Sequence, residues 1–221
     1  MPQCDSASTV LTAYADVPAP VRGQVRDLRI RWALQEIDRD YRVELLDVFT
    51  PRPDSYKSWQ PFGQVPAFDD GRQRLFESGA ILLYLGEQDA RLLPVDPTAR
   101  WQAITWLLAA LNSVEPFIGQ IGMLDFFQAG KPWAKEARPS ALKLVEARLS
   151  ATEAALGEAD WLAGPFSIAD IVMITVLRIL DHTPILRDYP ALAAYKTRGE
   201  SRPAFRRALA EQLESYASPA N

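Results

Sequence analysis

Strand-like sequence patterns stop at Phe76, and the rest of the chain shows only helical patterns. Before Phe76, stretches rich in β-branched and aromatic residues alternate with one stretch in which apolar residues recur at helical spacing. Elements of both kinds in the first third, followed by helices alone, exclude an all-β or an all-α chain. The pattern therefore predicts a mixed α/β domain followed by an all-helical domain.

The expected order in the first domain is β-α-β, a short irregular helix, then β-β-α. Strands are expected at 8–15, 41–49, 65–69 and 72–76, and helices around 25–37 and 78–85. Asp69-Asp70-Gly71 is a hairpin-turn sequence between the last two strands. Helices of the second domain are expected at 99–127, 139–156, 168–180, 190–198 and 203–216. Pro116 is expected to kink or break the first of them.

Residues 90–97 contain two prolines and show no periodicity, which is typical of a linker. The predicted domains are therefore 1–89 and 98–221, with 90–97 between them.

Composition excludes several classes of function. The chain has 24 Lys and Arg against 28 Asp and Glu, a net charge of −4, so no basic excess suggests a nucleic-acid partner. Cys4 and His182 are the only residues of their types, which excludes an intrachain disulfide and a metal site built from several of them. No signal peptide is apparent, and the longest apolar runs are six residues, against about 20 for a membrane span. We expect a cytoplasmic protein without metal, nucleic acid or membrane.

Two sequence motifs lie far apart in the chain. Residues 62–87 read FGQVPAFDDGRQRLFESGAILLYLGE, and residues 162–170 read LAGPFSIAD. In this order and spacing the chain resembles the cytosolic-type glutathione S-transferase family. The resemblance implies a thioredoxin-like domain at 1–89 that binds glutathione, and a helical bundle at 98–221 that contributes the electrophile pocket. It also implies a homodimer with a role in detoxification.

The Val65-Pro66 pair is the first part of the candidate binding site. A proline cannot donate to a β-ladder, so Pro66 is expected at the start or edge of a strand. The resemblance implies a cis bond at Pro66 and antiparallel pairing of glutathione with the Val65 backbone. It also implies that Gln64 donates to the glycine carboxylate of glutathione. The alternative is that Pro66 only opens a hairpin.

Glu77-Ser78 is the second part of the candidate site. Serine is a favourable N-cap, and the N–H groups of a first helical turn attract anions. The resemblance implies that the γ-glutamyl carboxylate of glutathione binds at Ser78 and that Glu77 meets its amino group. The alternative is an ordinary capped helix.

A transferase of this family must also stabilise a thiolate, and Tyr14 is the candidate for that role. Free thiols have a pKa of about 8.5. No Ser or Cys lies between Ala13 and Trp32, and Cys4 comes before the first strand. Residues 14–17, followed by Arg22-Gly23, resemble the pattern of tyrosine-type transferases. The alternative is that Tyr14 is a strand aromatic of the core.

The loop before the first helix departs from the family pattern. The prolines of residues 17–21 lengthen it, which leaves the thiol-activating group open. Arg22 and Arg26 are electrostatic candidates, or with Arg29 form a solvated cationic face of the helix.

Ser167 and Asp170 form a capping-box sequence, which predicts the start of a buried central helix rather than a chemical role. His182 is expected in a loop between helices, because no G-x-S-x-G sequence accompanies it. Some of the aromatic residues at 101–127 are candidates for the electrophile pocket, and the others for the core.

These observations favour a glutathione transferase that conjugates the glutathione thiolate to a small apolar electrophile. Glutathione-dependent isomerase or peroxidase activity on the same fold is one alternative. A non-catalytic protein that binds partners through this fold is the other.

Overall fold

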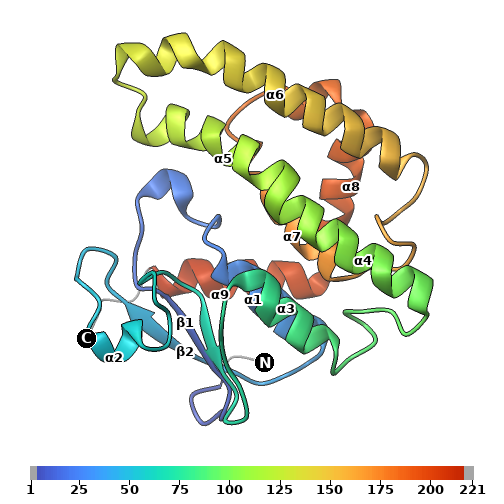
Figure 1. The fold of residues 1–221 in the computed structure, drawn as a ribbon. Helices are drawn as coiled ribbons and strands as arrows, with labels where there is room; N and C mark the ends of the chain where they lie inside the picture. Colours follow the sequence, from blue (N-terminus) through green and yellow to red (C-terminus); the bar gives the residue numbers. More distant parts are fainter. Residues whose placement is uncertain (1–3, 217–221) are drawn as a thin grey trace. The chain divides into compact units, whose positions relative to one another are not determined.

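The computed structural model describes residues 4–216 and contains two compact units (Figure 1). Of the described residues, the first unit comprises 4–92 and 202–216, and the second comprises Leu93–Ser201. The first unit carries the strands and the second is helical, as the sequence patterns predicted. The domains predicted from the sequence differ at the C-terminus, where the last helix belongs to the first unit.

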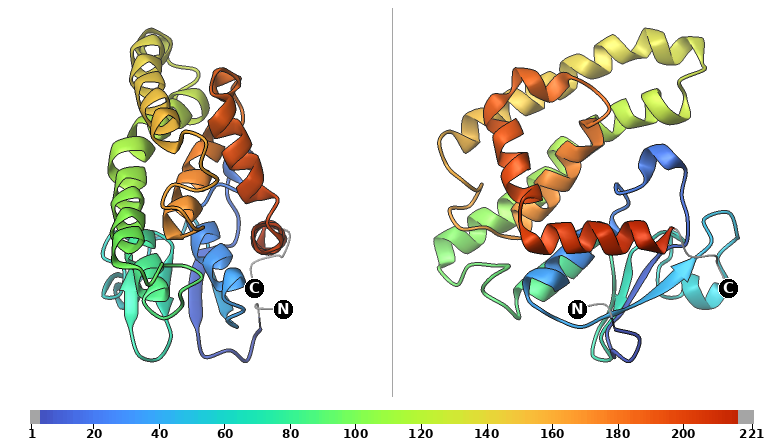
Figure 2. Two further views of the ribbon diagram at one scale, coloured as in Figure 1. Left: turned by 90° about the vertical axis from the view of Figure 1, so that its right-hand side faces the viewer. Right: turned by 180° about the vertical axis from the view of Figure 1, so that it is seen from behind.

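A four-stranded mixed sheet in the order β2-β1-β3-β4 forms the centre of the first unit (Figure 2). The strands are β1 (Val10–Tyr14), β2 (Arg42–Leu46), β3 (Ala67–Asp69) and β4 (Arg74–Phe76). β1 runs parallel to β2, whereas β3 runs antiparallel to both β1 and β4. Each strand lies within its predicted range. The apolar residues of β3 and most of those of β1 are buried, whereas those of the edge strands β2 and β4 are partly exposed.

Short and long helices complete this unit. They are η1 (Ala19–Val21), α1 (Asp27–Glu36), α2 (Asp54–Lys57), α3 (Ser78–Gly86) and α9 (Pro203–Ser215). α1 contacts both α3 and α9. Because α1 lies between them, nine of its ten residues are buried, charged ones included.

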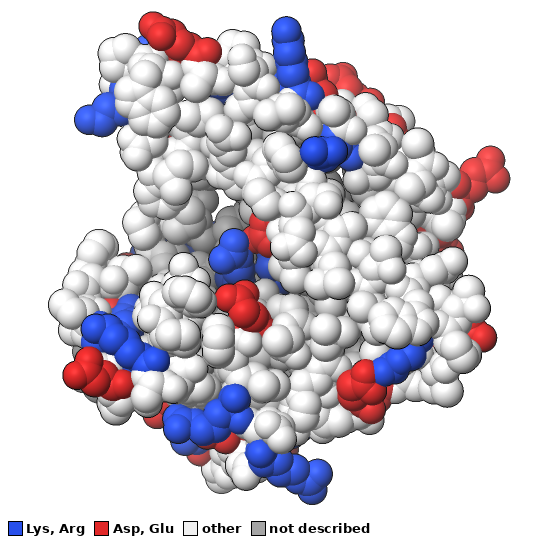
Figure 3. Space-filling view, in the orientation of Figure 1, with Lys and Arg blue, Asp and Glu red and all other residues white. Residues whose placement is uncertain are grey.

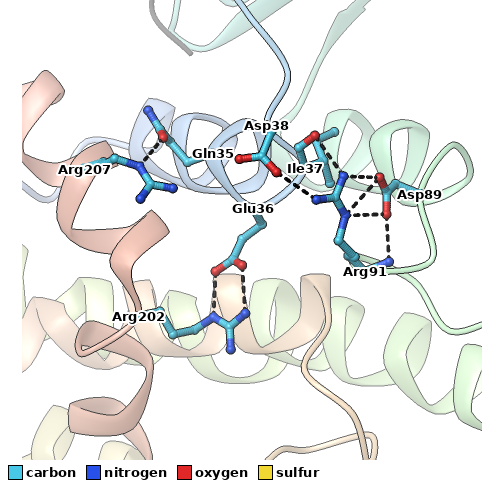
Figure 4. A network of polar contacts seen from close by, with 8 residues as sticks. All are labelled: Gln35, Glu36, Ile37, Asp38, Asp89, Arg91, Arg202 and Arg207. Atoms are coloured by element: carbon cyan, nitrogen blue, oxygen red, sulfur yellow. Dashed lines mark hydrogen bonds and ion pairs between the residues drawn. The ribbon is translucent and has the colours of Figure 1, made fainter. Parts of the chain in front are cut away.

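The C-terminal helix α9 packs on α1 of the thioredoxin-like unit. Trp32 and Phe205 meet edge to face, with ring centroids 4.8 Å apart. Arg202 donates two hydrogen bonds, of 2.6 and 2.7 Å, to the Glu36 carboxylate (Figure 4). Helical periodicity predicts that α9 has an apolar face, but it does not predict which part of the protein that face contacts. The sequence pattern alone therefore could not assign α9 to either domain.

The same end of α1 is held by a second arginine, from the loop after α3. Arg91 donates to the Asp38 carboxylate at 3.0 Å and to the Ile37 carbonyl oxygen at 2.9 Å (Figure 4). Arg91 also pairs with Asp89 at 2.8 Å. The C-terminal end of α1 is therefore fixed by side chains from two distant parts of the sequence.

The second unit contains only helices. They are α4 (Pro97–Ala109), η2 (Ala110–Val114), α5 (Glu115–Gly122), η3 (Met123–Phe127), α6 (Pro132–Leu156), α7 (Ile168–Leu177), η4 (Arg178–Leu180), η5 (Ile185–Asp188), α8 (Pro190–Glu200). α7 is buried along its whole length, as its apolar sequence predicted.

Prolines have different effects in the two long helices. The chain between α4 and α5 passes through the π-helical turn η2, and Pro116 is the second residue of α5. A proline cannot make the usual helical hydrogen bond, and a π-helical turn is one way to accommodate it. Pro139 does not begin α6 as the sequence suggested, because the helix already starts at Pro132 and passes through Pro139.

The predicted capping box at the start of α7 is confirmed. The Ser167 N–H donates to the Asp170 carboxylate at 2.8 Å, and the Ser167 side chain accepts from the first turn. The same carboxylate accepts from the Leu162 N–H at 3.0 Å and from the Tyr195 hydroxyl at 2.8 Å. Asp170 therefore joins three segments of the helical unit, and burial raises its pKa to about 6.

The stretch Pro97–Phe127 is long and apolar enough to span a membrane, judged by length and composition alone. Its most apolar 18-residue window has a mean hydropathy of 1.3, and 44% of that window is buried within the protein. Core helices of soluble proteins also meet these criteria.

Basic and acidic side chains are interspersed over the face shown in Figure 3, in keeping with the near balance of their numbers.

Candidate functional site

The β3–β4 pair brings the two predicted binding motifs to one end of the sheet. Ala67, the first residue of β3, lies opposite Phe76, the last residue of β4. Pro66 precedes Ala67 and Glu77 follows Phe76, so Pro66 and Glu77 lie at the same end of the sheet. The structure therefore joins two motifs that the sequence separates by a turn and two strands.

Tyr14 reaches the same end of the sheet from β1. Leu11 lies opposite Phe68 in the antiparallel β1–β3 pair. The last residue of β1 is therefore at the end where β3 begins. Tyr14 is half-buried there.

The Val65–Pro66 peptide bond is cis, as the resemblance implied. Both residues are buried and immediately precede β3. No described residue hydrogen-bonds to the backbone N–H or carbonyl group of Val65. This stretch therefore offers one donor and one acceptor to which an extended peptide could add. The neighbouring Gln64 side chain is exposed.

Glu77 and Ser78 form a sharp turn from β4 into α3. Glu77 has a φ of 67°, which is uncommon for a residue with a side chain, and it is exposed. Glu77 occupies the N-cap position without a side-chain cap, so the prediction that Ser78 is the N-cap was wrong. Ser78 is instead the first helical residue and only 4% exposed. The chain reverses at Glu77, which places the Ser78 hydroxyl at the start of the helix.

Arg29 is a functional candidate that the sequence analysis missed. Its Nη1 donates to the Ser78 hydroxyl oxygen at 3.2 Å, and its side chain is buried. The Ser78 hydroxyl thus lies beside a guanidinium and at a helix N-terminus, both of which favour an anion. The sequence of α1 contains two arginines, Arg29 and Arg31, and no local pattern indicates that Arg29 is the one beside Ser78.

The predicted cationic face of the first helix does not form. α1 begins at Asp27, so Arg22 and Arg26 lie in the loop before it and are exposed. Arg22 pairs with Asp16 at 2.8 Å, where both side chains are well exposed. The longer loop thereby separates these two cations from Arg29.

Arg52 lies between Tyr14 and the segment before Val65. Its guanidinium carbon is 5.5 Å from the centre of the Tyr14 ring, within the range of a cation–π contact. Its Nε donates to the Gly63 carbonyl oxygen at 3.3 Å, and its Nη1 donates to the Asp47 carbonyl oxygen at 2.6 Å. Arg52 therefore adds positive charge beside the aromatic ring of Tyr14. Sequence reasoning missed it because the proline-rich loop has no periodicity.

Cys4 and His182 are not part of this group. The Cys4 thiol lies 3.1 Å from the Ser6 hydroxyl. His182 follows η4 in an inter-helix loop, as predicted, and contacts the Asp125 carboxylate at 2.9 Å and the Ile179 carbonyl oxygen at 2.9 Å. Asp125 in turn accepts two hydrogen bonds from Arg138, which lowers its pKa. These contacts indicate a structural role for His182.

The helical unit also carries exposed aromatic residues. Trp101 is 66% exposed and Phe127 is 55% exposed, whereas Trp106, Phe117 and Phe126 are partly covered. A cavity of about 220 Å³ lies at the turn between η3 and α6, lined by Leu124, Asp125, Ala129, Ala134, Lys135 and Arg138. Three of these lining residues are charged: Asp125, Lys135 and Arg138. Within residues 4–216, no cluster of three metal-binding side chains is found.

Comparison with known proteins agrees with this architecture. The N-terminal domain of glutathione S-transferase matches residues 20–87, and its C-terminal domain matches residues 114–203. The chain is 32% identical to glutathione S-transferase P 1 of Xenopus laevis over 203 residues, which cover 90% of each chain.

Two similar solved structures are bacterial glutathione transferases. One, from Burkholderia graminis, has two glutathione molecules bound per subunit. Its TM-score is 0.79 at 26% identity, covering 91% of this chain and 87% of that one. The other, from Pseudomonas putida, has one glutathione disulfide bound per subunit. Its TM-score is 0.78 at 25% identity, covering 91% of this chain and 90% of that one.

A thioredoxin-like unit with a cis-proline edge, followed by a helical unit with a buried capping box, defines a glutathione transferase fold. The chain belongs to the glutathione S-transferase family.

Proposed function

We propose that the protein is a glutathione transferase that conjugates the glutathione thiolate to a small apolar electrophile. The observation that carries the proposal is the meeting of the open Val65 backbone and the Glu77–Ser78 turn at one end of the sheet. A peptide backbone and a zwitterionic amino-acid head group match these two features. Similar proteins solved with glutathione bound support the choice of ligand.

In this proposal each part of the site has one task. The Val65 backbone pairs with the cysteinyl residue of glutathione, and Gln64 donates to the glycine carboxylate. The γ-glutamyl carboxylate binds at Ser78, where Arg29 adds positive charge, and Glu77 meets the amino group. The Tyr14 hydroxyl donates to the thiolate, which then attacks an electrophile held close to it.

The proposal keeps a two-domain organisation, with glutathione bound by the thioredoxin-like part and the electrophile by the helical part. It also includes a cytoplasmic homodimer. Light scattering that gives twice the chain mass of 24.7 kDa supports the dimer, and a mass of one chain contradicts it.

Isomerase or peroxidase activity would use the same glutathione site, so a screen with electrophiles, isomerisable substrates and hydroperoxides separates these reactions.

A partner-binding protein without catalysis would be indicated by a stable fold that does not bind glutathione. The open Val65 edge lies at the same end of the sheet as the Glu77–Ser78 turn, which favours a binding site for glutathione over that alternative.

The first experiment is calorimetric titration of the wild type and of a Glu77→Ala, Ser78→Ala double variant with glutathione. Each substitution removes a hydrogen bond to a charged group, which is worth about 1.5–3 kcal/mol. We therefore expect the dissociation constant to rise at least about 100-fold. Glu136→Ala, Ser140→Ala is the matched control, because both residues are exposed on α6. Equal affinity of the wild type and the site variant would exclude the proposed site.

Replacement of Tyr14 by phenylalanine tests thiolate stabilisation. Removing one donor to a developing anion costs about 100-fold in kcat or more. We expect kcat with an aryl halide to fall by about 100-fold, while the calorimetric affinity for glutathione is unchanged. The pH midpoint of kcat/KM should move up toward the pKa of a free thiol, about 8.5. Tyr189→Phe, in the helical unit, is the control, and unchanged turnover in Tyr14→Phe would remove Tyr14 from this role.

A further inference from the structure

The segment from Gln64 to Ala67 is held by side chains at both of its ends. The Gln64 N–H donates to the Gln60 side-chain oxygen at 3.1 Å, and the Gln64 carbonyl oxygen accepts from the Tyr56 hydroxyl at 2.6 Å. At the other end, the Ala67 N–H donates to the Thr12 hydroxyl oxygen at 2.8 Å. The Thr12 and Tyr56 hydroxyl groups are themselves 2.9 Å apart.

Only one assignment of donors and acceptors is consistent with these hydrogen bonds. A carbonyl oxygen can only accept, so the Tyr56 proton points to Gln64. The Tyr56 oxygen must then accept from the Thr12 hydroxyl, whose own oxygen accepts from the Ala67 N–H. The result is a directed chain of three hydrogen bonds that spans the cis Val65–Pro66 bond from one side to the other.

The chain of hydrogen bonds also explains why the Val65 backbone is open. Leu11–Phe68 is the last backbone pair of the β1–β3 ladder at this end. Beyond it the Thr12 side chain, rather than its backbone, takes the Ala67 N–H. The segment is therefore fixed without using the N–H and carbonyl group of Val65.

We infer that Thr12, Tyr56 and Gln60 are positioning residues that hold the Val65 backbone ready to pair with the cysteinyl peptide group of glutathione. This inference rests on the proposed function. A backbone edge that is already ordered loses less conformational freedom when a peptide binds to it, so the affinity is higher.

The surroundings of the three side chains suit this role. Thr12 is 0%, Gln60 2% and Tyr56 8% exposed, so water has little access to their hydrogen bonds. Burial raises the pKa of Tyr56 above its usual value, which is consistent with a protonated hydroxyl that donates to Gln64. Because all three side chains are buried, exposure to solvent does not account for their polar groups.

The test compares Tyr56→Phe with Tyr84→Phe. Both substitutions remove one hydroxyl from the same unit, but the Tyr84 hydroxyl donates to Asp70 at 2.9 Å, in the β3–β4 turn. The Gln64 carbonyl group loses its donor in Tyr56→Phe, which loosens the segment and should raise the dissociation constant for glutathione about tenfold. We expect kcat at saturating glutathione to stay within about twofold, and Tyr84→Phe to change neither quantity. Thr12→Val should weaken binding similarly, and Thr12→Ser, which keeps the hydroxyl, should restore it.

A modified ligand separates positioning from general stability. Glutathione methylated at the cysteinyl nitrogen cannot donate to the Val65 carbonyl oxygen. If the three side chains act through this edge, Tyr56→Phe should lose much less affinity for the methylated peptide than for glutathione. Equal losses for both ligands would overturn the inference, as would unchanged affinity for glutathione in both Tyr56→Phe and Thr12→Val. Failure of the wild type to bind glutathione would instead contradict the proposed function.

Discussion

Replacement of Asp170 by alanine is expected to lower the free energy of unfolding of the helical unit by about 3–5 kcal/mol. The carboxylate accepts hydrogen bonds from the N–H groups of Leu162 and Ser167 and from the Tyr195 hydroxyl. Asp170 and Ser167 are fully buried, so alanine leaves buried donors without an acceptor. Urea unfolding followed by circular dichroism measures the change.

Asp160→Ala is the control for this experiment. Asp160 pairs with Arg198 at 3.1 Å, but its side chain is 70% exposed, and such surface pairs contribute about 1 kcal/mol or less. A change in Asp170→Ala no larger than in Asp160→Ala would contradict the structural role of the capping box.

The same residue predicts a pH dependence. Burial raises the pKa of Asp170 from 3.8 to about 6. Between these values the folded protein retains a proton that the unfolded chain has lost, so the part of the stability that depends on this proton falls as the pH rises. It is fully present below pH 4 and lost above pH 6. Asp170→Asn lacks this titration. The amount by which its free energy of unfolding falls below that of the wild type should therefore be about 3 kcal/mol smaller at pH 7 than at pH 4. A cost that is equal at both pH values would contradict the prediction.

Replacement of Asp27 by alanine is expected to have a similarly large effect on the thioredoxin-like unit. Asp27 and Arg31 form an ion pair of 2.8 Å within α1, with side chains 1% and 0% exposed. Gln212 of α9 donates to the same carboxylate at 2.7 Å. Alanine leaves the buried Arg31 guanidinium without the carboxylate that pairs with it at 2.8 Å, and breaking a buried pair in this way costs about 3–5 kcal/mol. Urea unfolding followed by tryptophan fluorescence measures the loss, since Trp32 is buried beside α9.

Two variants provide the comparison. Asp54→Ala breaks an exposed pair with Lys57 at 4.0 Å and should change stability by less than about 0.5 kcal/mol. Asp27→Leu combined with Arg31→Met removes both charges, and buried pairs replaced in this way are often neutral in stability. If Asp27→Ala is no more damaging than Asp54→Ala, the buried pair does not stabilise the contact between α1 and α9.

Local sequence was sufficient where the interacting residues are close in the chain. The Ser167–Asp170 capping box spans three positions, and the turn at 69–71 is closed by Asp69 and Asp70 accepting from N–H groups two or three residues ahead. Such contacts follow from the order of residue types. The strands and long helices were predicted on the same basis, because burial of one face imposes a period on the sequence.

The candidate site was predicted only in part. Gln64, Val65 and Pro66, together with Glu77 and Ser78, carry sequence motifs and were identified from them. Arg29 and Ser78 are 49 positions apart, and Thr12 and Tyr56 are 44 apart. No local pattern records such pairs, since a buried arginine and a surface arginine look alike in the sequence.

The sequence by itself therefore determined the kinds of elements, their order, the binding motifs and the family resemblance. Only the tertiary structure decided that α9 packs on α1, that Arg29 is buried at Ser78, and that side chains fix the cis-proline segment. The physical reason is that periodicity and capping depend on neighbours along the chain. A helix face or a polar side chain finds its partner only when the chain folds back on itself.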